Sequence, residues 1–250
     1  MASMTLEQRQ ELLLSLRSDA GQAEHAKGRT ADNFYPVAEH LRALEPDVVL
    51  VVGDRGAGKS LLVSVAADRA MREALVGRKL SLRLPEGEAQ WKAAYPMAYG
   101  PDQAGLQDFV VRHHDSIKTA TQELWFTYLI RVLGELLPAE DTEKFKALVT
   151  ASGAEIEERY SDFLSAGAAP LVALDNLDKR LVAEDRWVFI TYDELDTLYY
   201  SDWSAMGALI RGLISFWANY SRRWSRIRPK IFRLLRRICG PVAALAGGRA

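Results

Sequence analysis

The chain has 250 residues, of which 48% are hydrophobic and 26% are charged, and its formal net charge is −1. This composition is typical of a soluble globular protein, and the length allows one large domain or one domain with an appendage. A single cysteine, Cys239, excludes an internal disulfide framework. No signal-peptide pattern and no apolar run long enough to cross a bilayer is visible, so we expect a cytoplasmic protein without a membrane partner.

Acidic and basic residues are separated along the chain. The 48 residues that follow Asp202 contain ten Lys and Arg and no Asp or Glu, whereas residues 1–202 carry 22 basic and 33 acidic side chains. Such a division predicts a basic face or tail with an anionic partner, or a segment that is not native to the fold.

The first part of the chain alternates helical and strand patterns. Residues 1–33 are predicted to form an N-terminal amphipathic helix and a connector, and residues 34–46 a short helix that a proline ends. The apolar run 47–52 predicts a strand buried on both faces. Helical periodicity follows at 59–77, and alternation at 80–85 predicts the next strand.

The second part begins with a long helical stretch. Residues 86–170 are predicted to be mostly helical, including a packed core helix at 124–138. A second buried strand is predicted at 187–192, a helix at 204–224, and a further strand that begins at 230–232. Strands that alternate with helices indicate an α/β protein with a parallel sheet.

The stretch after the first strand, GDRGAGKS from Gly53 to Ser60, matches the pattern G-x-x-x-x-G-K-[ST] between a strand and a helix. Glycines let backbone N–H groups approach phosphate oxygens, and a helix start directs its positive dipole end at the anion. Lys59 is expected to contact the β- and γ-phosphates, and the Ser60 hydroxyl to bind Mg²⁺. The alternative is a glycine-rich turn that happens to precede a lysine. The predicted nucleotide-binding residues form one run: Gly53, Asp54, Arg55, Gly56, Ala57, Gly58, Lys59, Ser60 and Leu61.

Two adjacent acids, Asp193 and Glu194, follow the second buried strand. Ligands of open α/β sheets bind at the carboxyl ends of strands, and hydrolysis needs one carboxylate near Mg²⁺ and a second group that orients water. Asp196 is a third acid, to which we assign no role. The alternative interpretation is a solvated helix N-terminus, where acids favour the dipole.

These two segments resemble the Walker A and Walker B motifs of P-loop NTPases. The acid pair is similar to that of the additional-strand, catalytic-glutamate division, which includes the AAA+, STAND and KAP-type ATPases. The resemblance covers about residues 34–233. It implies a parallel-sheet P-loop NTPase core with residues 86–170 as a helical insertion between the second strand and the Walker B strand. It also implies ATP and Mg²⁺ as ligands, Asp193 as the metal-side carboxylate, and Glu194 and Lys59 as catalytic groups.

The end of the chain departs from this resemblance. In the family, the strand after Walker B is followed by a helix, a fifth strand and often a helical lid, whereas 18 residues follow Phe232. We therefore expect residues 234–250 to be a basic and apolar tail that is truncated or altered. Arg233 and Arg236 are either sensor residues of the kind found in the family or solvated charges.

Other residues give weaker signals. Phe34 and Tyr35 could stack on an adenine base, although core packing is the preferred interpretation. The pair His113-His114 lacks the spacing of a metal site and suits a surface segment. Three acids that precede the second buried strand are interpreted as solvated: Asp175, Asp178 and Asp185.

The basic run 221–237 interleaves Trp224 and Phe232 with cations. Nucleic acid or an acidic membrane surface could bind such a run. We prefer an arginine-rich interface with a second copy of the chain or with a partner protein, or an altered C-terminus, because a strand at 230–232 would be buried.

The sequence thus predicts a Mg²⁺-dependent ATPase in which nucleotide binding and hydrolysis drive a conformational switch. ATP rather than GTP follows from the resemblance alone, since DNLD at 175–178 is a poor match to the guanine motif N-K-x-D. Two alternatives stay open: a scaffold or sensor that binds nucleotide without hydrolysing it, and a motor ATPase stimulated by nucleic acid.

Overall fold

The computed structural model describes residues 41–54, 58–69, 72, 88–95, 103–150, 156–198 and 203–234. The chain divides into two units, Met1–Val37 and Ala38–Ala250, and every described residue belongs to the second unit. Several predicted segments lie wholly or partly outside the described residues: the N-terminal helix with its connector, the first part of the helix at 34–46 with Phe34 and Tyr35, the end of the helix at 59–77, the strand at 80–85, and the tail from 235 onward.

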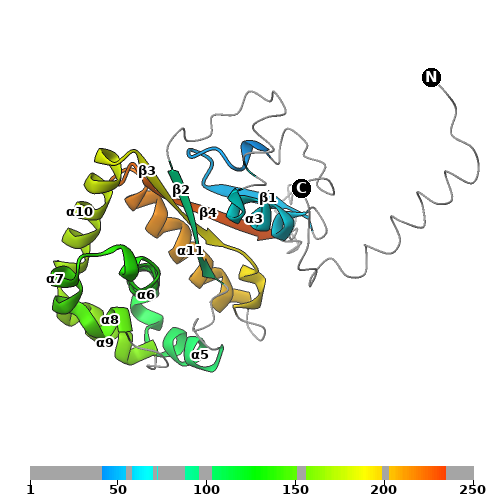
Figure 1. Cartoon of the computed structure of the whole chain (residues 1–250). Coiled ribbons are helices and arrows are strands. Elements are labelled where there is room, and N and C mark those ends of the chain that lie inside the picture. The colour runs from blue at the N-terminus through cyan, green and yellow to red at the C-terminus, as the bar shows by residue number, and fades with distance from the viewer. Residues whose placement is uncertain are drawn as a thin grey trace, which may run out of the picture. The chain divides into compact units, whose positions relative to one another are not determined.

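Four parallel strands form the sheet of the second unit (Figure 1). They are β1 (Leu50–Gly53), β2 (Glu88–Tyr95), β3 (Arg186–Tyr192) and β4 (Ile227–Leu234), and their spatial order is β1-β4-β3-β2. The predicted α/β class with a parallel sheet is therefore confirmed. β4 pairs with both β1 and β3, so it separates the strand before the glycine-rich turn from the strand before the acid pair.

Helices make up much of the rest of the described chain. The α-helices are α3 (Lys59–Ala67), α5 (Gln103–Arg112), α6 (Ile117–Leu133), α7 (Ala139–Thr142), α8 (Lys146–Thr150), α9 (Ile156–Ala166), α10 (Ala169–Ala183) and α11 (Trp203–Tyr220). Short 3-10 helices are η2 (His114–Ser116), η3 (Gly134–Leu136), η4 (Glu143–Phe145) and η5 (Leu195–Thr197). A buried core helix is confirmed, but α6 spans Ile117–Leu133 instead of the predicted 124–138. Within the described ranges, no helix is both long and apolar enough to span a membrane.

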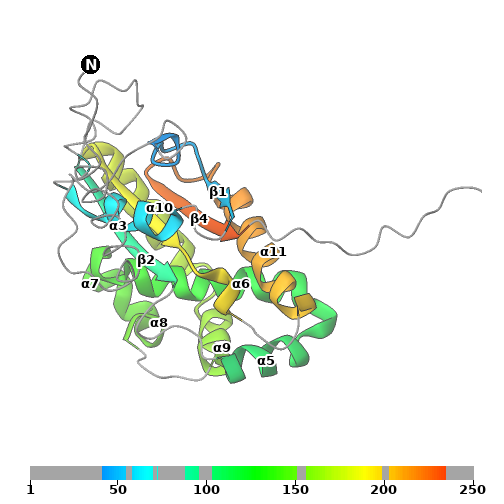
Figure 2. The ribbon, with the colours of Figure 1, turned by 90° about the vertical axis from the view of Figure 1, so that its right-hand side faces the viewer.

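Helices cover both faces of the sheet. Side chains alternate between the two faces along each strand, so apolar side chains on both faces must be covered. Val188, Ile190 and Tyr192 of β3 belong to one large buried cluster with α6, α10 and α11. Phe189 and Leu62 of α3 are also buried but do not belong to this cluster, and alternation along β3 turns Phe189 to the opposite face. Figure 2 shows α3 on the side of the sheet away from α6. The strand that precedes the acid pair is thus buried on both faces of the sheet.

The sequence predicts helix for β2, and this prediction is wrong. The segment EAQWKAAY is rich in residues that favour helices, and it lies inside the predicted helical stretch 86–170. In the structure, Trp91 stacks on Phe189 with ring centroids 4.4 Å apart, and Lys92 pairs with Glu135 at 2.9 Å. These contacts and the pairing with β3 outweigh local propensity. The first described helix after β2 begins at Gln103.

β1 is shorter and more exposed than predicted. It begins at Leu50, and the side chains of Leu50 and Val52 are 41% and 44% exposed, so the prediction of a strand buried on both faces is wrong. β1 lies at the edge of the described sheet, whereas β3 and β4 contribute the residues that pack in the large cluster. An apolar run does not by itself distinguish an edge strand from a central one.

Pro229 lies inside β4, a central strand, where proline is normally excluded. The N–H of Ile231 donates to Val49 O at 2.8 Å. Backbone groups of alternate residues in a strand point to the same side, so the backbone nitrogen of Pro229 also faces the side of β1. β1 begins only at Leu50, opposite Ile231. The missing N–H of Pro229 therefore costs no hydrogen bond with β1, and the strand extends back to Ile227 instead of starting at 230.

Candidate functional site

The glycine-rich turn links β1 to α3, as its flanking patterns predict. Gly58 has a φ of +77°, and the helix follows at once, since the N–H of Leu62 donates to Gly58 O at 2.9 Å. A Cβ at Gly58 would meet no atom within 4 Å, so glycine serves there for its backbone conformation and not for space. Arg55, Gly56 and Ala57 of the predicted run lie outside the described residues.

Lys59 begins α3, and its ammonium lies against the end of β1. Nζ donates to Gly53 O and to Asp54 O, each at 2.8 Å. Ser60 is exposed in the first turn of α3, and Leu61 is partly buried. The described part of the predicted nucleotide-binding run thus brings a cation and a hydroxyl to the positive dipole end of a helix.

Asp193 follows directly after β3 and is 8% exposed. Its backbone N–H donates to Tyr95 O at 2.8 Å. Within the described part of the chain, no group donates a hydrogen bond to its carboxylate. Burial of a carboxylate without a partner is costly, and a cation beside it would lower that cost.

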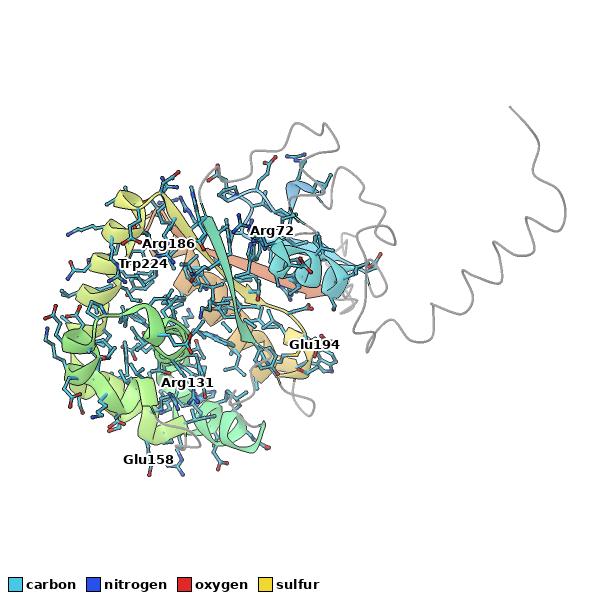
Figure 3. All side chains as sticks on the ribbon, viewed as in Figure 1. Arg72, Arg131, Glu158, Arg186, Glu194 and Trp224 are labelled. Atoms are coloured by element: carbon cyan, nitrogen blue, oxygen red, sulfur yellow. The ribbon has the colours of Figure 1, made fainter. Side chains whose placement is uncertain are left out.

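Glu194 is exposed and has a left-handed backbone, with φ 51° and ψ 30°. It lies beyond the end of β3, at the opposite end of the sheet from Arg186 and Trp224 (Figure 3). This conformation costs a non-glycine residue about 1 kcal/mol and is frequent at functional sites. Asp196 lies in η5, partly buried, and has no assigned role.

The register of β4 relates the glycine turn to the acid pair. Gly53 pairs with Leu234, and Tyr192 pairs with Ile231. Because the strands are parallel, the ends of β1 and β3 emerge at the same edge of the sheet. They are two strand spacings apart across the sheet and three residues apart along it, which together give about 14 Å. One ligand of moderate size can therefore contact both segments.

Arg233 of β4 lies between these two strand ends. It pairs with Val52 of β1, one residue before β4 ends, and it is partly buried. Of the two candidate sensor residues, Arg233 is thus at the edge that carries the glycine turn and the acids. Arg236 lies outside the described residues.

Sequence reasoning missed a buried cation in the middle of β4. Lys230 has 0% exposure, and Phe189 lies beneath its Nζ, 5.5 Å from ring centroid to nitrogen. Nζ donates to three carbonyls of the turn before β1: those of Ala43 at 3.0 Å, Glu45, and Val48 at 2.7 Å. Burial lowers the pKa of Lys230 to about 7, whereas the three acceptors favour the ammonium form. A lysine inside an apolar strand pattern is the signal that could have identified it.

Asp178 of α10 is buried, so its interpretation as a solvated acid is wrong. Its carboxylate accepts hydrogen bonds from three consecutive backbone N–H groups, those of Ser225 at 2.9 Å, Arg226 at 2.7 Å and Ile227 at 3.1 Å. The Ser225 hydroxyl adds a fourth bond at 3.2 Å. The carboxylate therefore fixes the point where β4 begins.

Asp175, one turn earlier in α10, is not a free solvated acid either. It accepts hydrogen bonds from Arg223 Nε at 2.7 Å and from Trp224 Nε1 at 2.9 Å. The bonds from Arg223 hold the pKa of the Asp175 carboxyl below its usual value. Both acids thus anchor the loop that enters β4. Their burial could not be predicted from neighbouring residues, because their partners are distant in the sequence.

The described part of the basic run makes contacts within the chain. Arg226 pairs with Asp185 at 3.1 Å, and its guanidinium lies 4.3 Å from the ring centroid of Trp187. Trp224 and Phe232 are buried, each with 1% exposure. The two aromatic side chains that a nucleic-acid partner would need are therefore in the protein interior.

The two adjacent histidines have different environments. His114 is exposed in η2, whereas His113 is partly buried with Nε2 3.2 Å from Glu157 Oε2. The His113 ring packs against Phe109 and Tyr160. Among the residues that the structure describes, no three His, Cys, Asp or Glu side chains come together as metal ligands.

Comparisons with protein-family models, with curated proteins and with solved structures found no match for this chain. Function must therefore be inferred from the residues and the geometry of the site.

Proposed function

We propose that the chain is a cytoplasmic, Mg²⁺-dependent P-loop ATPase of the additional-strand, catalytic-glutamate division, in which hydrolysis drives a conformational switch. One observation carries the proposal. The Lys59 ammonium at a glycine turn and the buried Asp193 carboxylate lie at the same edge of a parallel sheet. The parallel sheet in which β4 pairs with both motif strands is compatible with it.

Binding of the triphosphate would use the turn and the start of α3. Phosphate oxygens are stronger acceptors than the carbonyls of Gly53 and Asp54, so they compete for the Lys59 ammonium. The left-handed backbone at Gly58 starts the helix directly after the turn. The dipole of α3 then adds positive potential where the phosphates lie.

The residues at this edge fit Mg²⁺, a hard cation that prefers oxygen ligands and is usually held by one or two carboxylates together with phosphates. Asp193 supplies a buried carboxylate without a partner among the described residues, and Ser60 supplies a hydroxyl in the first turn of α3. When bound, the ion would offset the negative charge that develops on the transferred phosphoryl group.

Hydrolysis would depend on Glu194. Its carboxylate is exposed beside the buried Asp193, and its backbone holds a left-handed conformation. An exposed carboxylate can accept the proton of an attacking water and orient the oxygen toward the γ-phosphate. Lys59 would then stabilise the charge on the phosphate oxygens during the displacement.

Calorimetric titration with ATP, with and without Mg²⁺, tests the binding step. We expect Lys59→Ala to weaken binding about 100-fold, equivalent to about 2.7 kcal/mol. Lys144→Ala, which alters an exposed lysine in η4, is the matched control and should bind as the wild type does. Equal affinity of Lys59→Ala and the wild type would overturn the proposal, and a parallel titration with GTP measures the choice of base.

Single-turnover phosphate release tests the chemical step. Glu194→Gln should lower the rate at least about 100-fold without weakening ATP binding, because general base catalysis is worth this much. Glu158→Gln, on the exposed side of α9, is the control. Equal slow rates in Glu194→Gln and the wild type would favour a nucleotide-binding scaffold, and strong stimulation by nucleic acid would favour a motor.

A further inference from the structure

Tyr95, at the end of β2, touches the segments on both sides of the acid pair. Its carbonyl accepts the backbone N–H of Asp193 at 2.8 Å, and its hydroxyl lies 2.8 Å from Thr197 Oγ1. Asp193 and Glu194 therefore lie between two anchors that belong to one residue. The Tyr95 side chain itself is 9% exposed, so its position is fixed by packing.

An irregularity in β2 gives Tyr95 this orientation. Ala93 pairs with Thr191 and Tyr95 pairs with Tyr192. Ala94 and Tyr95 of β2 therefore lie opposite the single residue Tyr192 of β3. Ala94 and Tyr95 consequently both join the buried cluster with Tyr192, although regular alternation would turn Tyr95 to the opposite face. Bulges of this kind re-aim side chains beside functional sites.

The hydrogen bonds run in one direction from Tyr95 to Glu194. Thr197 Oγ1 donates its only proton to Glu194 O at 2.8 Å, so the Tyr95 hydroxyl must be the donor to Thr197 Oγ1. The backbone N–H of Thr197 donates to the same Glu194 carbonyl, also at 2.8 Å. Successive bonds of this kind polarise and strengthen one another.

The Glu194 backbone needs such support. A left-handed conformation in a non-glycine residue persists when the surrounding structure holds it. The carbonyl of Glu194 is the atom held by Thr197, and a fixed carbonyl holds the ψ of this residue at 30°.

We propose that Tyr95 and Thr197 are positioning residues whose hydroxyls hold the backbone of Glu194 in the conformation that directs its carboxylate at the reacting edge. This inference rests on the proposed ATPase function. Neither residue touches the nucleotide in this assignment, so the pair acts on turnover and leaves binding unchanged.

The test compares kcat and the dissociation constant for Mg²⁺–ATP in full-length variants. Tyr95→Phe and Thr197→Val each delete one hydroxyl, and we expect kcat to fall about tenfold, since small misplacement of a catalytic group is costly. The dissociation constant should change less than about twofold. Thr197→Ser keeps the hydroxyl and should restore most of the rate. In a Glu194→Gln background, Tyr95→Phe should cause no further loss.

Thr191→Val is the matched control, because Thr191 Oγ1 also donates to β2, at Lys92 O, but within the paired strands before Asp193 and not to Glu194. It should keep the wild-type kcat. If Tyr95→Phe does not fold, Thr197→Val and Thr197→Ser report on the same contact. A wild-type kcat in Thr197→Val, or an equal fall in Thr191→Val, overturns the inference and leaves the ATPase proposal intact. Wild-type protein that binds Mg²⁺–ATP but releases no phosphate overturns both.

Discussion

Buried charges that bond to segments entering the strands differ from a buried charge at a strand's carboxyl end in how much of their bonding capacity the protein uses. Asp178 accepts four hydrogen bonds from the residues that enter β4, and Lys230 donates all three of its protons to carbonyls before β1. After β3, Asp193 is 8% exposed, and its carboxylate receives no hydrogen bond from any described residue.

This difference separates structural charges from candidate chemical ones. A buried charge whose bonds are all made to backbone groups fixes local conformation, and its loss leaves those groups without partners. A buried charge with unused capacity raises the free energy of the fold and suits a ligand. Stability measurements can therefore assign each charge to one class.

The largest effect should come from Asp178→Ala. Three backbone N–H groups would lose their acceptor in the protein interior, and we expect the free energy of unfolding to fall by about 3 kcal/mol. Urea denaturation measures this loss. Asp115→Ala, at a fully exposed acid in η2, is the control and should change stability by less than about 0.5 kcal/mol. A similarly small change in Asp178→Ala would show that the loop before β4 does not need the carboxylate.

A smaller effect, dependent on pH, should come from Lys230→Met. The pKa of Lys230 is about 7 in the folded chain and 10.5 for the unperturbed group, so the unfolded state binds more protons between these values. Stability of the wild type should therefore rise with pH from about 7 to about 10, by about 2 kcal/mol relative to Lys230→Met.

Denaturation at pH 6, 8 and 10 measures this gain for the wild type and the variant. Lys118→Met, which removes an exposed lysine of α6, should keep the wild-type dependence on pH. A difference between wild type and Lys230→Met that stays constant with pH would contradict the lowered pKa.

The smallest stability change, and one of opposite sign, should come from Asp193→Asn. Removal of a buried charge without a partner should leave the free energy of unfolding unchanged or raise it by up to about 1 kcal/mol. The same variant should lose the extra thermal stability that Mg²⁺ adds in the presence of ATP. Destabilisation of the size expected for Asp178→Ala would place Asp193 among the structural charges instead.

Local patterns predicted the elements whose signal lies within a few neighbouring residues. The glycine turn before Lys59, the buried strand before Asp193 and the core helix α6 were all predicted in this way. In each case, backbone geometry and side-chain period suffice to define the element. The chemistry proposed for the site was also predicted from residue types, and it stays a prediction.

The errors have one physical origin, namely contacts between residues distant in sequence. β2 has a helix-favouring composition, but Trp91 stacks on Phe189 almost 100 positions later. Asp178 has the sequence context of a surface acid, yet its partners lie 47 or more positions away, beginning at Ser225. No local period or propensity contains such information.

By itself, the sequence determined an α/β chain with a glycine turn, a lysine and an acid pair, each at the end of an apolar strand, because these features depend on neighbouring residues. Only the tertiary structure decided that β4 lies between β1 and β3, that β1 is partly exposed, and that Tyr95 reaches the turn after Asp193. The order of strands and the bulge in β2 follow from packing on the two faces of the sheet, which couples segments far apart in the chain.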